Sequence, residues 1–288
     1  MDGTPQSIWR TVGENDPRKM VEARIQLHWA VQPVMAFADS ALERLPDDSQ
    51  ANLGWSDDLE ALVGRQRPDG LSAGLRIPDM TLLVFDEGRA GADSISLEGQ
   101  TIDSAVSWLE EEVAARSGGP PERPIRIRDY EMPEHPVATG AVFAVDNPSV
   151  FAELARWFAN GNRAMQGLTS RDEGWAEVRC WPHHFDLGTV ISLESSGDAS
   201  SGRSIGVGLS PGDASYPKPY FYVNPYGLAD QPADGPALES GGRWHTDGWF
   251  GAVLSATCIL EISEDSRESA VSSFLRGAVD AARNLLTA

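Results

Sequence analysis

The order of secondary structure repeats along this 288-residue chain, and the repetition strongly constrains its fold. Each half is predicted to begin with a helix, continue through several short strands and end with a helix. Runs of strands between helices are typical of an α+β fold in which helices cover antiparallel sheets. We therefore expect a two-lobed, pseudo-duplicated architecture with lobes at residues 1–140 and 141–288; one continuous domain is the alternative.

In the first half, apolar residues with helical spacing begin after Asp16-Pro17 and continue to about Leu45. Pro33 is expected to kink this helix, because proline has no backbone N–H to donate. The further elements expected in this half are strands over 53–64 and 71–86 and a helix over 101–116.

In the second half, a helix is expected from Asn147-Pro148 through Met165. The other elements expected there are strands at 175–195, 204–210 and 219–224, a loop at 227–242 and a helix at about 267–286. The two closing helices share Ser-Ala-Val-Ser, at residues 104–107 and 269–272. We interpret this as a diverged internal duplication, against the alternative of chance similarity. If the halves arose by duplication, Trp55 corresponds to Trp181, and Gly74-Leu75 to Gly208-Leu209.

The net charge of −20, from 43 acidic and 23 basic residues, limits which kinds of molecule the protein can bind. Such a field repels phosphate backbones, so we expect no nucleic-acid partner. No apolar run approaches the length of a membrane span, and the polar N-terminus does not resemble a signal peptide. Cys180 and Cys258 form neither a disulfide framework nor a zinc-finger spacing. The sequence therefore predicts a soluble cytoplasmic protein.

Lysine is rare, since Lys19 and Lys218 are the only two among the 23 basic residues. A GC-rich genome favours arginine over lysine, but it does not explain the acidic excess. Proteins of a salty cytoplasm show both features, because salt screens self-repulsion and carboxylates keep the surface hydrated. A halophilic source is one interpretation, and an ordinary acidic protein from a GC-rich bacterium is the other.

Residues 175–251 concentrate tryptophan, tyrosine and histidine. Tyr220 and Tyr222 are expected on one face of a strand and Phe221 on the other. Tryptophans offer large apolar surfaces, while histidines and Arg243 can orient an anionic or polar ligand. The alternative is that the aromatic residues form core and the histidines satisfy buried partners. The predicted ligand-binding residues are Trp181, His183, His184, Tyr220, Tyr222, Trp244 and His245.

Four segments of this region resemble a family of uncharacterised bacterial proteins. They are Trp-Pro-His-His-Phe-Asp at 181–186, Gly-Val-Gly-Leu-Ser-Pro-Gly-Asp at 206–213, Pro-Tyr-Phe-Tyr-Val at 219–223 and Trp-His-Thr-Asp-Gly-Trp at 244–249. The resemblance is best over residues 175–255. It implies kinship and carries no established activity, so it assigns no role to any residue.

Two His-x-Asp pairs suggest a metal site as a second hypothesis. Residues i and i+2 of a strand share a face, so His184 and Asp186 are expected to point together, and His245 and Asp247 repeat the spacing. Two imidazoles and two carboxylates suit a divalent metal such as Zn, Mn or Fe. Alternatively, His184 is a core histidine and Asp247 belongs to a turn. A metal-dependent enzyme and a structural or partner-binding protein are therefore the alternatives to small-molecule binding.

Residues 208–212 match the G-x-S-x-G pattern of hydrolase nucleophile elbows. The residue after the serine should lend its N–H to an oxyanion hole, and here that residue is Pro211, which has none. We therefore expect a strand that ends in a turn at this point.

Salt dependence of the melting temperature separates the two interpretations of the acidity. If the protein is halophilic, raising NaCl from ~0.1 to ~2 M should raise Tm by several degrees, because the Debye length falls to a few Å. Sulfate is avoided, since it stabilises most proteins by exclusion from their surface. A Tm that is flat or falls over this range would favour the ordinary acidic protein.

Overall fold

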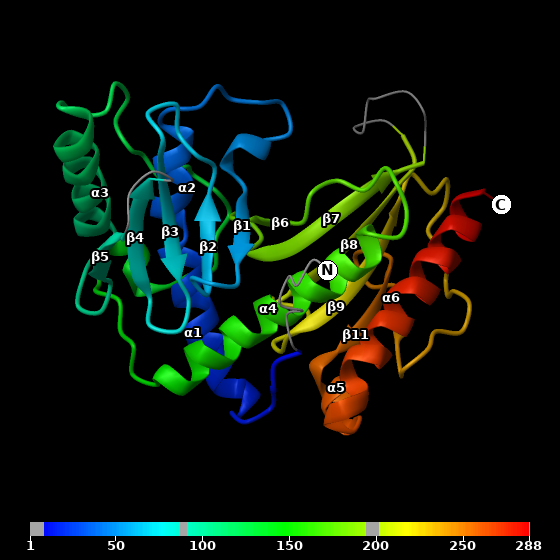
Figure 1. Cartoon of the computed structure of the whole chain (residues 1–288). Coiled ribbons are helices and arrows are strands. Elements are labelled where there is room, and N and C mark those ends of the chain that lie inside the picture. The colour runs from blue at the N-terminus through cyan, green and yellow to red at the C-terminus, as the bar shows by residue number, and fades with distance from the viewer. Residues whose placement is uncertain (1–8, 87–90, 194–201, 288) are drawn as a thin grey trace, which may run out of the picture. The chain divides into compact units, whose positions relative to one another are not determined.

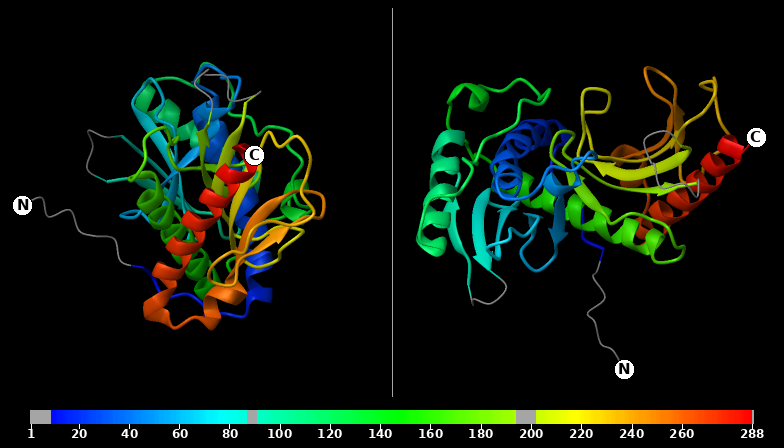
Figure 2. Two further views of the ribbon diagram at one scale, coloured as in Figure 1. Left: turned by 90° about the vertical axis from the view of Figure 1, so that its right-hand side faces the viewer. Right: turned by 90° about the horizontal axis from the view of Figure 1, so that it is seen from above.

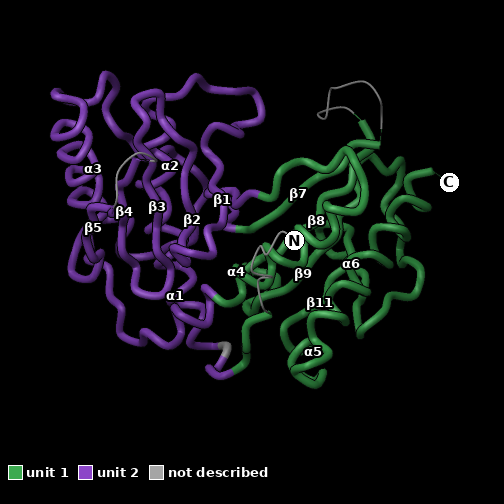
Figure 3. The backbone as a smooth tube through the Cα atoms, viewed as in Figure 1, with its two compact units in different colours: residues 1–13, 156–178, 186–288 green, residues 14–155, 179–185 purple. Residues whose placement is uncertain are grey.

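The computed structural model describes residues 9–86, 91–193 and 202–287, and the chain forms two compact units (Figure 3). Unit 2 comprises residues 14–155 and 179–185, and unit 1 comprises residues 1–13, 156–178 and 186–288. The predicted lobes were divided after residue 140, whereas the boundary between the units nearest that point lies after residue 155, inside helix α4 (Pro148–Thr169). A single helix thus belongs to both units.

Unit 2 contains antiparallel strands in the order β6-β1-β2-β3-β4-β5 (Figure 1). Their bounds are β1 Leu53–Ser56, β2 Ala61–Gly64, β3 Leu71–Arg76, β4 Thr81–Asp86, β5 Asp93–Ser96 and β6 Arg179–Trp181. The strands expected at 53–64 and 71–86 are each a hairpin, so that prediction was wrong in detail. Glu60 and Met80, both with φ 48°, end the two turns in the left-handed conformation.

The helices of unit 2 are α1 (Pro17–Ala30), α2 (Gln32–Asp39) and α3 (Ile102–Ser117), with short 3₁₀ helices η1 (Ser49–Ala51) and η2 (Pro136–Thr139). The predicted kink is confirmed as a break at Val31, which puts Pro33 in the first turn of α2. There its missing N–H leaves no hydrogen bond unmade. The helix ends at Asp39, earlier than expected, and α2 packs against β2 and β3.

Unit 1 contains antiparallel strands in the order β7-β8-β9-β11-β10. Their bounds are β7 Asp186–Ser192, β8 Ser204–Ser210, β9 Tyr220–Tyr226, β10 Arg243–His245 and β11 Gly251–Ser255. Helix α6 (Glu264–Thr287) and the second part of α4 lie on the same face of this sheet, and α5 (Ala256–Glu261) follows β11 (Figures 1 and 2). Both units thus have the expected α+β architecture.

The strand expected at 175–195 is interrupted, because residues 182–185 form a turn between β6 and β7. Phe185, with φ 56°, occupies the left-handed conformation at its end. The strand at 204–210 and the loop at 227–242 are confirmed, and β8 ends at Ser210, as expected for residues 208–212.

The proposed duplication matches the two units only in part. Gly74 lies on β3 of unit 2 and Gly208 on β8 of unit 1, and the shared Ser-Ala-Val-Ser lies in α3 and in α6. Trp55 and its expected counterpart Trp181, however, lie on β1 and β6, which both belong to unit 2. The duplication stays a prediction. In the part of the chain that is described, no helix has both the length and the apolar character needed to cross a membrane.

Helix α4 carries two glycines that test its packing on the sheet. A Cβ on Gly161 would lie 2.5 Å from Leu209 Cδ2 and 2.9 Å from Leu209 Cβ, whereas one on Gly167 would meet nothing within 4 Å. Gly161→Ala should therefore lower the free energy of unfolding by about 1–3 kcal/mol. Gly167→Ala should raise it by up to about 1 kcal/mol through helix propensity. Urea denaturation measures both, and equal effects would contradict this packing.

Candidate functional site

The strand registers of unit 1 place glycine, tyrosine and polar residues together on one face of its sheet. Gly188 pairs with Gly208, Gly208 pairs with Tyr222, Tyr222 pairs with Val253, and Val253 pairs with Arg243. Paired residues share a face, as do residues two apart on a strand. We call the central part of this face the tyrosine face; it consists of Asp186, Gly188, Gly206, Gly208, Ser210, Tyr220, Tyr222, Asn224, Arg243, His245, Gly251 and Val253.

The opposite face of the same sheet is apolar and fully buried. Leu209, Phe221, Val223 and Leu254 are each 0% exposed, and α6 packs against β8, β9 and β11. The expectation that Phe221 points away from its two flanking tyrosines is confirmed by this alternation. The centre of the helix-covered face is thus apolar, Thr189 on the neighbouring strand β7 is a buried polar residue of that face, and most polar residues lie on the other face.

Glycines on β8 allow tyrosine rings of β9 to lie on the sheet. A Cβ on Gly208 would come within 2.4 Å of the Tyr222 ring, and one on Gly206 within 2.9 Å of the Tyr226 ring. Tyr222 therefore reaches over β8 and donates a hydrogen bond to Asp186 on β7. The Gly-x-Gly sequence at 206–208 serves this close approach.

Two tyrosines of β9 give their hydroxyl hydrogens to carboxylates. Tyr222 donates to Asp186, and Tyr220 donates to Asp213 at 2.5 Å. Burial and the adjacent carboxylates raise the pKa of both phenols above the ordinary tyrosine value. Asp213 also accepts backbone hydrogen bonds from Ser215 and Tyr216, which fixes it at the turn after β8.

His245 is oriented by two hydrogen bonds and an aromatic contact. Its Nε2 lies 2.6 Å from the Asp247 carbonyl oxygen, which can only accept, so Nε2 carries the hydrogen. Nδ1 then accepts a hydrogen bond from the Tyr216 hydroxyl at 2.8 Å. Trp249 stacks on the imidazole at 4.2 Å between centroids, and the Arg243 guanidinium lies 5.3 Å from the Tyr216 ring centroid. The Nε2 hydrogen of His245 and the hydroxyl hydrogen of Tyr216 are thus both donated within the protein.

Trp244 lies on the other side of β10 from His245. Its ring stacks on Phe250 with centroids 4.8 Å apart, and its Nε1 donates to the Pro236 carbonyl at 2.7 Å. Of the predicted ligand-binding residues, the tyrosine face therefore contains Tyr220, Tyr222 and His245, without Trp244.

The three remaining predicted ligand-binding residues belong to unit 2, on β6 and the turn that follows. The His183 ring lies 4.1 Å from that of His184, 5.4 Å from that of Tyr130 and 6.1 Å from that of Trp181, between centroids. Burial, followed by electrostatic repulsion from the adjacent imidazole, lowers the pKa of His183 to about 4. The imidazole of His183 is thus neutral at pH 7.

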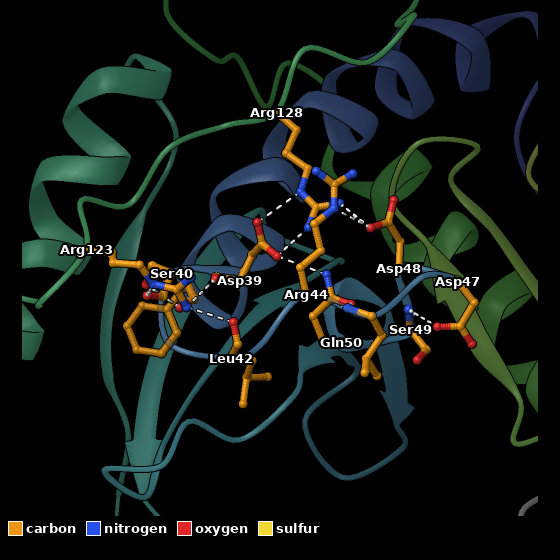
Figure 4. A network of polar contacts seen from close by, with 12 residues as sticks. Asp39, Ser40, Leu42, Arg44, Asp47, Asp48, Ser49, Gln50, Arg123 and Arg128 are labelled. Atoms are coloured by element: carbon orange, nitrogen blue, oxygen red, sulfur yellow. Dashed lines mark hydrogen bonds and ion pairs between the residues drawn. The ribbon is translucent and has the colours of Figure 1, made fainter.

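Tyr130, whose ring contacts His183, is held by Arg128, which belongs to an ion-pair network (Figure 4). Arg128 pairs with Asp39 and, at 2.8 Å, with Asp48, and Gln50 donates to Asp39 at 3.0 Å. Arg128 also donates to the Tyr130 hydroxyl at 3.0 Å. Since Arg128 already has two carboxylate partners, its role here is to position Tyr130.

The turn at 182–185 is anchored by helix α1 and the start of α2. His28 Nε2 donates to the Pro182 carbonyl at 2.9 Å, and Gln32 donates to the same oxygen at 2.8 Å. The His28 ring also stacks on Phe185 at 5.3 Å. Burial lowers the pKa of His28 to about 4, since its charged form would lose hydration.

The metal hypothesis stays a prediction, but Asp186 and His245, two of its four residues, already have hydrogen-bond partners. His184 lies in a turn, so the strand alternation used to pair it with Asp186 does not apply. His245 contacts the backbone oxygen of Asp247, and Asp186 accepts from Tyr222. Over residues 9–86, 91–193 and 202–287, no group of three or more His, Cys, Asp or Glu is placed to hold a metal ion.

Sequence reasoning missed the roles of Asp213 and Tyr216, although both lie beside β9. The signal available was the aspartate seven residues before Tyr220, at a turn that brings it back to the strand.

No protein-family model, curated protein or solved structure matches the chain. The resemblance to uncharacterised bacterial proteins therefore stays a prediction.

Acid destabilisation tests the anchoring by His28. Its pKa of about 4 lies below the unfolded value of 6.5. Below pH 6.5 the unfolded state therefore binds the proton more readily. The contribution of neutral His28 to the free energy of unfolding is complete above pH 6.5. It is lost as the pH falls toward 4, by up to about 3 kcal/mol. Urea denaturation should show the stability difference between the protein and His28→Gln shrinking over this range. A constant difference would contradict a neutral, buried His28.

Proposed function

We propose that the protein binds a small polar molecule on the tyrosine face of unit 1. The observation that carries the proposal is the Tyr222–Asp186 hydrogen bond across Gly208, which orders an aromatic ring and a carboxylate on the face that α6 does not cover. Orienting groups before a ligand arrives reduces the entropy lost on binding.

The composition of the face supports binding over a purely structural role. A sheet face that only packed against other parts of a protein would be expected to be apolar, because polar groups cost free energy on burial unless they are hydrogen-bonded, and carboxylates cost the most. This face instead combines the carboxylate of Asp186 with phenols and an imidazole, and Asp213 at the adjoining turn adds a second carboxylate. Parts of the face are accessible, since Arg243 is exposed and Tyr222 and His245 are half-buried.

The experiment is a thermal-shift screen of small polar metabolites, followed by calorimetric titration of each hit. Tyr222→Phe keeps the ring over Gly208 and removes only the hydroxyl, so it should weaken binding by about tenfold or more. Tyr130→Phe is the matched control, because Tyr130 is also a hydrogen-bonded phenol but belongs to unit 2. It should change affinity by less than about twofold.

Circular dichroism in the near-ultraviolet range establishes that both variants are folded. A hit weakened equally by both substitutions, or by Tyr130→Phe alone, would place binding elsewhere. A screen without hits would favour the structural or partner-binding alternative.

A further inference from the structure

We infer that the tyrosine face recognises a small organic cation, such as an alkylammonium or quaternary ammonium group. This inference rests on the proposed function, and it names the chemical class of the ligand. It differs from the anionic or polar ligand that the histidines and Arg243 first suggested.

The central strands of the face present an acceptor whose own hydrogen is already donated. The hydroxyl hydrogens of Tyr220 and Tyr222 go to Asp213 and Asp186. Tyr220 is buried and is also hydrogen-bonded to Ser210, whereas the half-buried Tyr222 oxygen keeps a lone pair that can accept from a ligand. The Nε2 hydrogen of His245 goes to the Asp247 carbonyl. A ligand that fits this arrangement supplies donors or positive charge.

Asn224 adds a further acceptor at the centre of the face. Its Oδ1 is buried and has no hydrogen-bond partner among the described residues. This oxygen lies beside Gly251 of β11, and Gly251 pairs with His245 of β10. A Cβ on Gly251 would lie 2.2 Å from this oxygen and 2.6 Å from the Trp249 ring. The acceptor and the indole therefore adjoin each other.

Aromatic faces on the same surface favour positive charge. Ring quadrupoles attract ammonium and guanidinium groups, and aromatic side chains grouped with carboxylates are suited to quaternary ammonium ligands. The chain itself provides an example, because the Arg243 guanidinium lies over the Tyr216 ring. Arg243 is the only basic residue in the tyrosine face as defined, and it is exposed. The two carboxylates lie beside buried and half-buried phenols, where solvent screens their charge less.

Three probes of matched shape isolate the effect of charge. Choline carries a trimethylammonium group, 3,3-dimethylbutan-1-ol has a neutral tert-butyl group in its place, and 3,3-dimethylbutanoate is an anion. Calorimetric titration should show choline binding about tenfold or more tightly than the other two probes. Failure of choline to bind at millimolar concentration, or equal binding of the neutral alcohol, would overturn the inference.

Charge-removing substitutions locate the effect. Asp186→Asn and Asp213→Asn should each weaken choline binding about tenfold and leave the neutral alcohol within about twofold. Asp230→Asn is the control, because Asp230 is exposed in the loop after β9 and outside the face. The two aspartates give independent variants if one fails to fold. Equal weakening by the control would overturn the assignment to this face.

The two proposals fail in different ways. If the butanoate binds most tightly and Tyr222→Phe weakens it, the face binds ligands but the cation inference is wrong. If choline binds and Tyr222→Phe has no effect, the protein binds cations elsewhere and the proposed function of the tyrosine face is wrong.

Discussion

The close approach of Tyr222 to Gly208 is the contact on which the tyrosine face depends. A ring can lie flat on a neighbouring strand only where that strand has no side chain, and a Cβ at Gly208 would overlap the ring. With the ring in place, its hydroxyl reaches Asp186 on the strand beyond. Glycine in a strand has an entropic cost, and here the position has a definite structural reason.

The two faces of the unit 1 sheet divide the tasks of stability and recognition. Fully buried residues such as Leu209 and Phe221 face helices α4 and α6 and supply the apolar core. The polar groups lie on the other face, where carboxylate–phenol hydrogen bonds satisfy them. In unit 2, the turn at 182–185 is anchored by helix residues His28 and Gln32, so the His183–His184 pair is held without helping to form the tyrosine face.

Local patterns in the sequence predicted much of this fold. Alternation placed Tyr220 and Tyr222 opposite Phe221, and the chemistry of Pro211 predicted that β8 ends in a turn. The hairpins within 53–64 and 71–86 and the turn at 182–185 were missed, because these turns contain Glu60, Met80 and Phe185 in left-handed conformations without glycine. The partners of the tyrosines were also missed, since strand register and a turn bring Asp186 and Asp213 to them, and neither is a local property of the sequence.

Tyrosine ionisation followed by NMR, with ¹³C at the ζ carbon, tests most directly whether the phenols give their hydrogens to the carboxylates. Tyr220 and Tyr222 should remain protonated above about pH 10, where tyrosine ordinarily ionises. The Tyr222 signal should then titrate at lower pH in Asp186→Asn, because a neighbouring negative charge is removed. Ionisation of Tyr222 near pH 10 in the unaltered protein, with no change in the variant, would contradict the Tyr222–Asp186 pair and the binding face built on it.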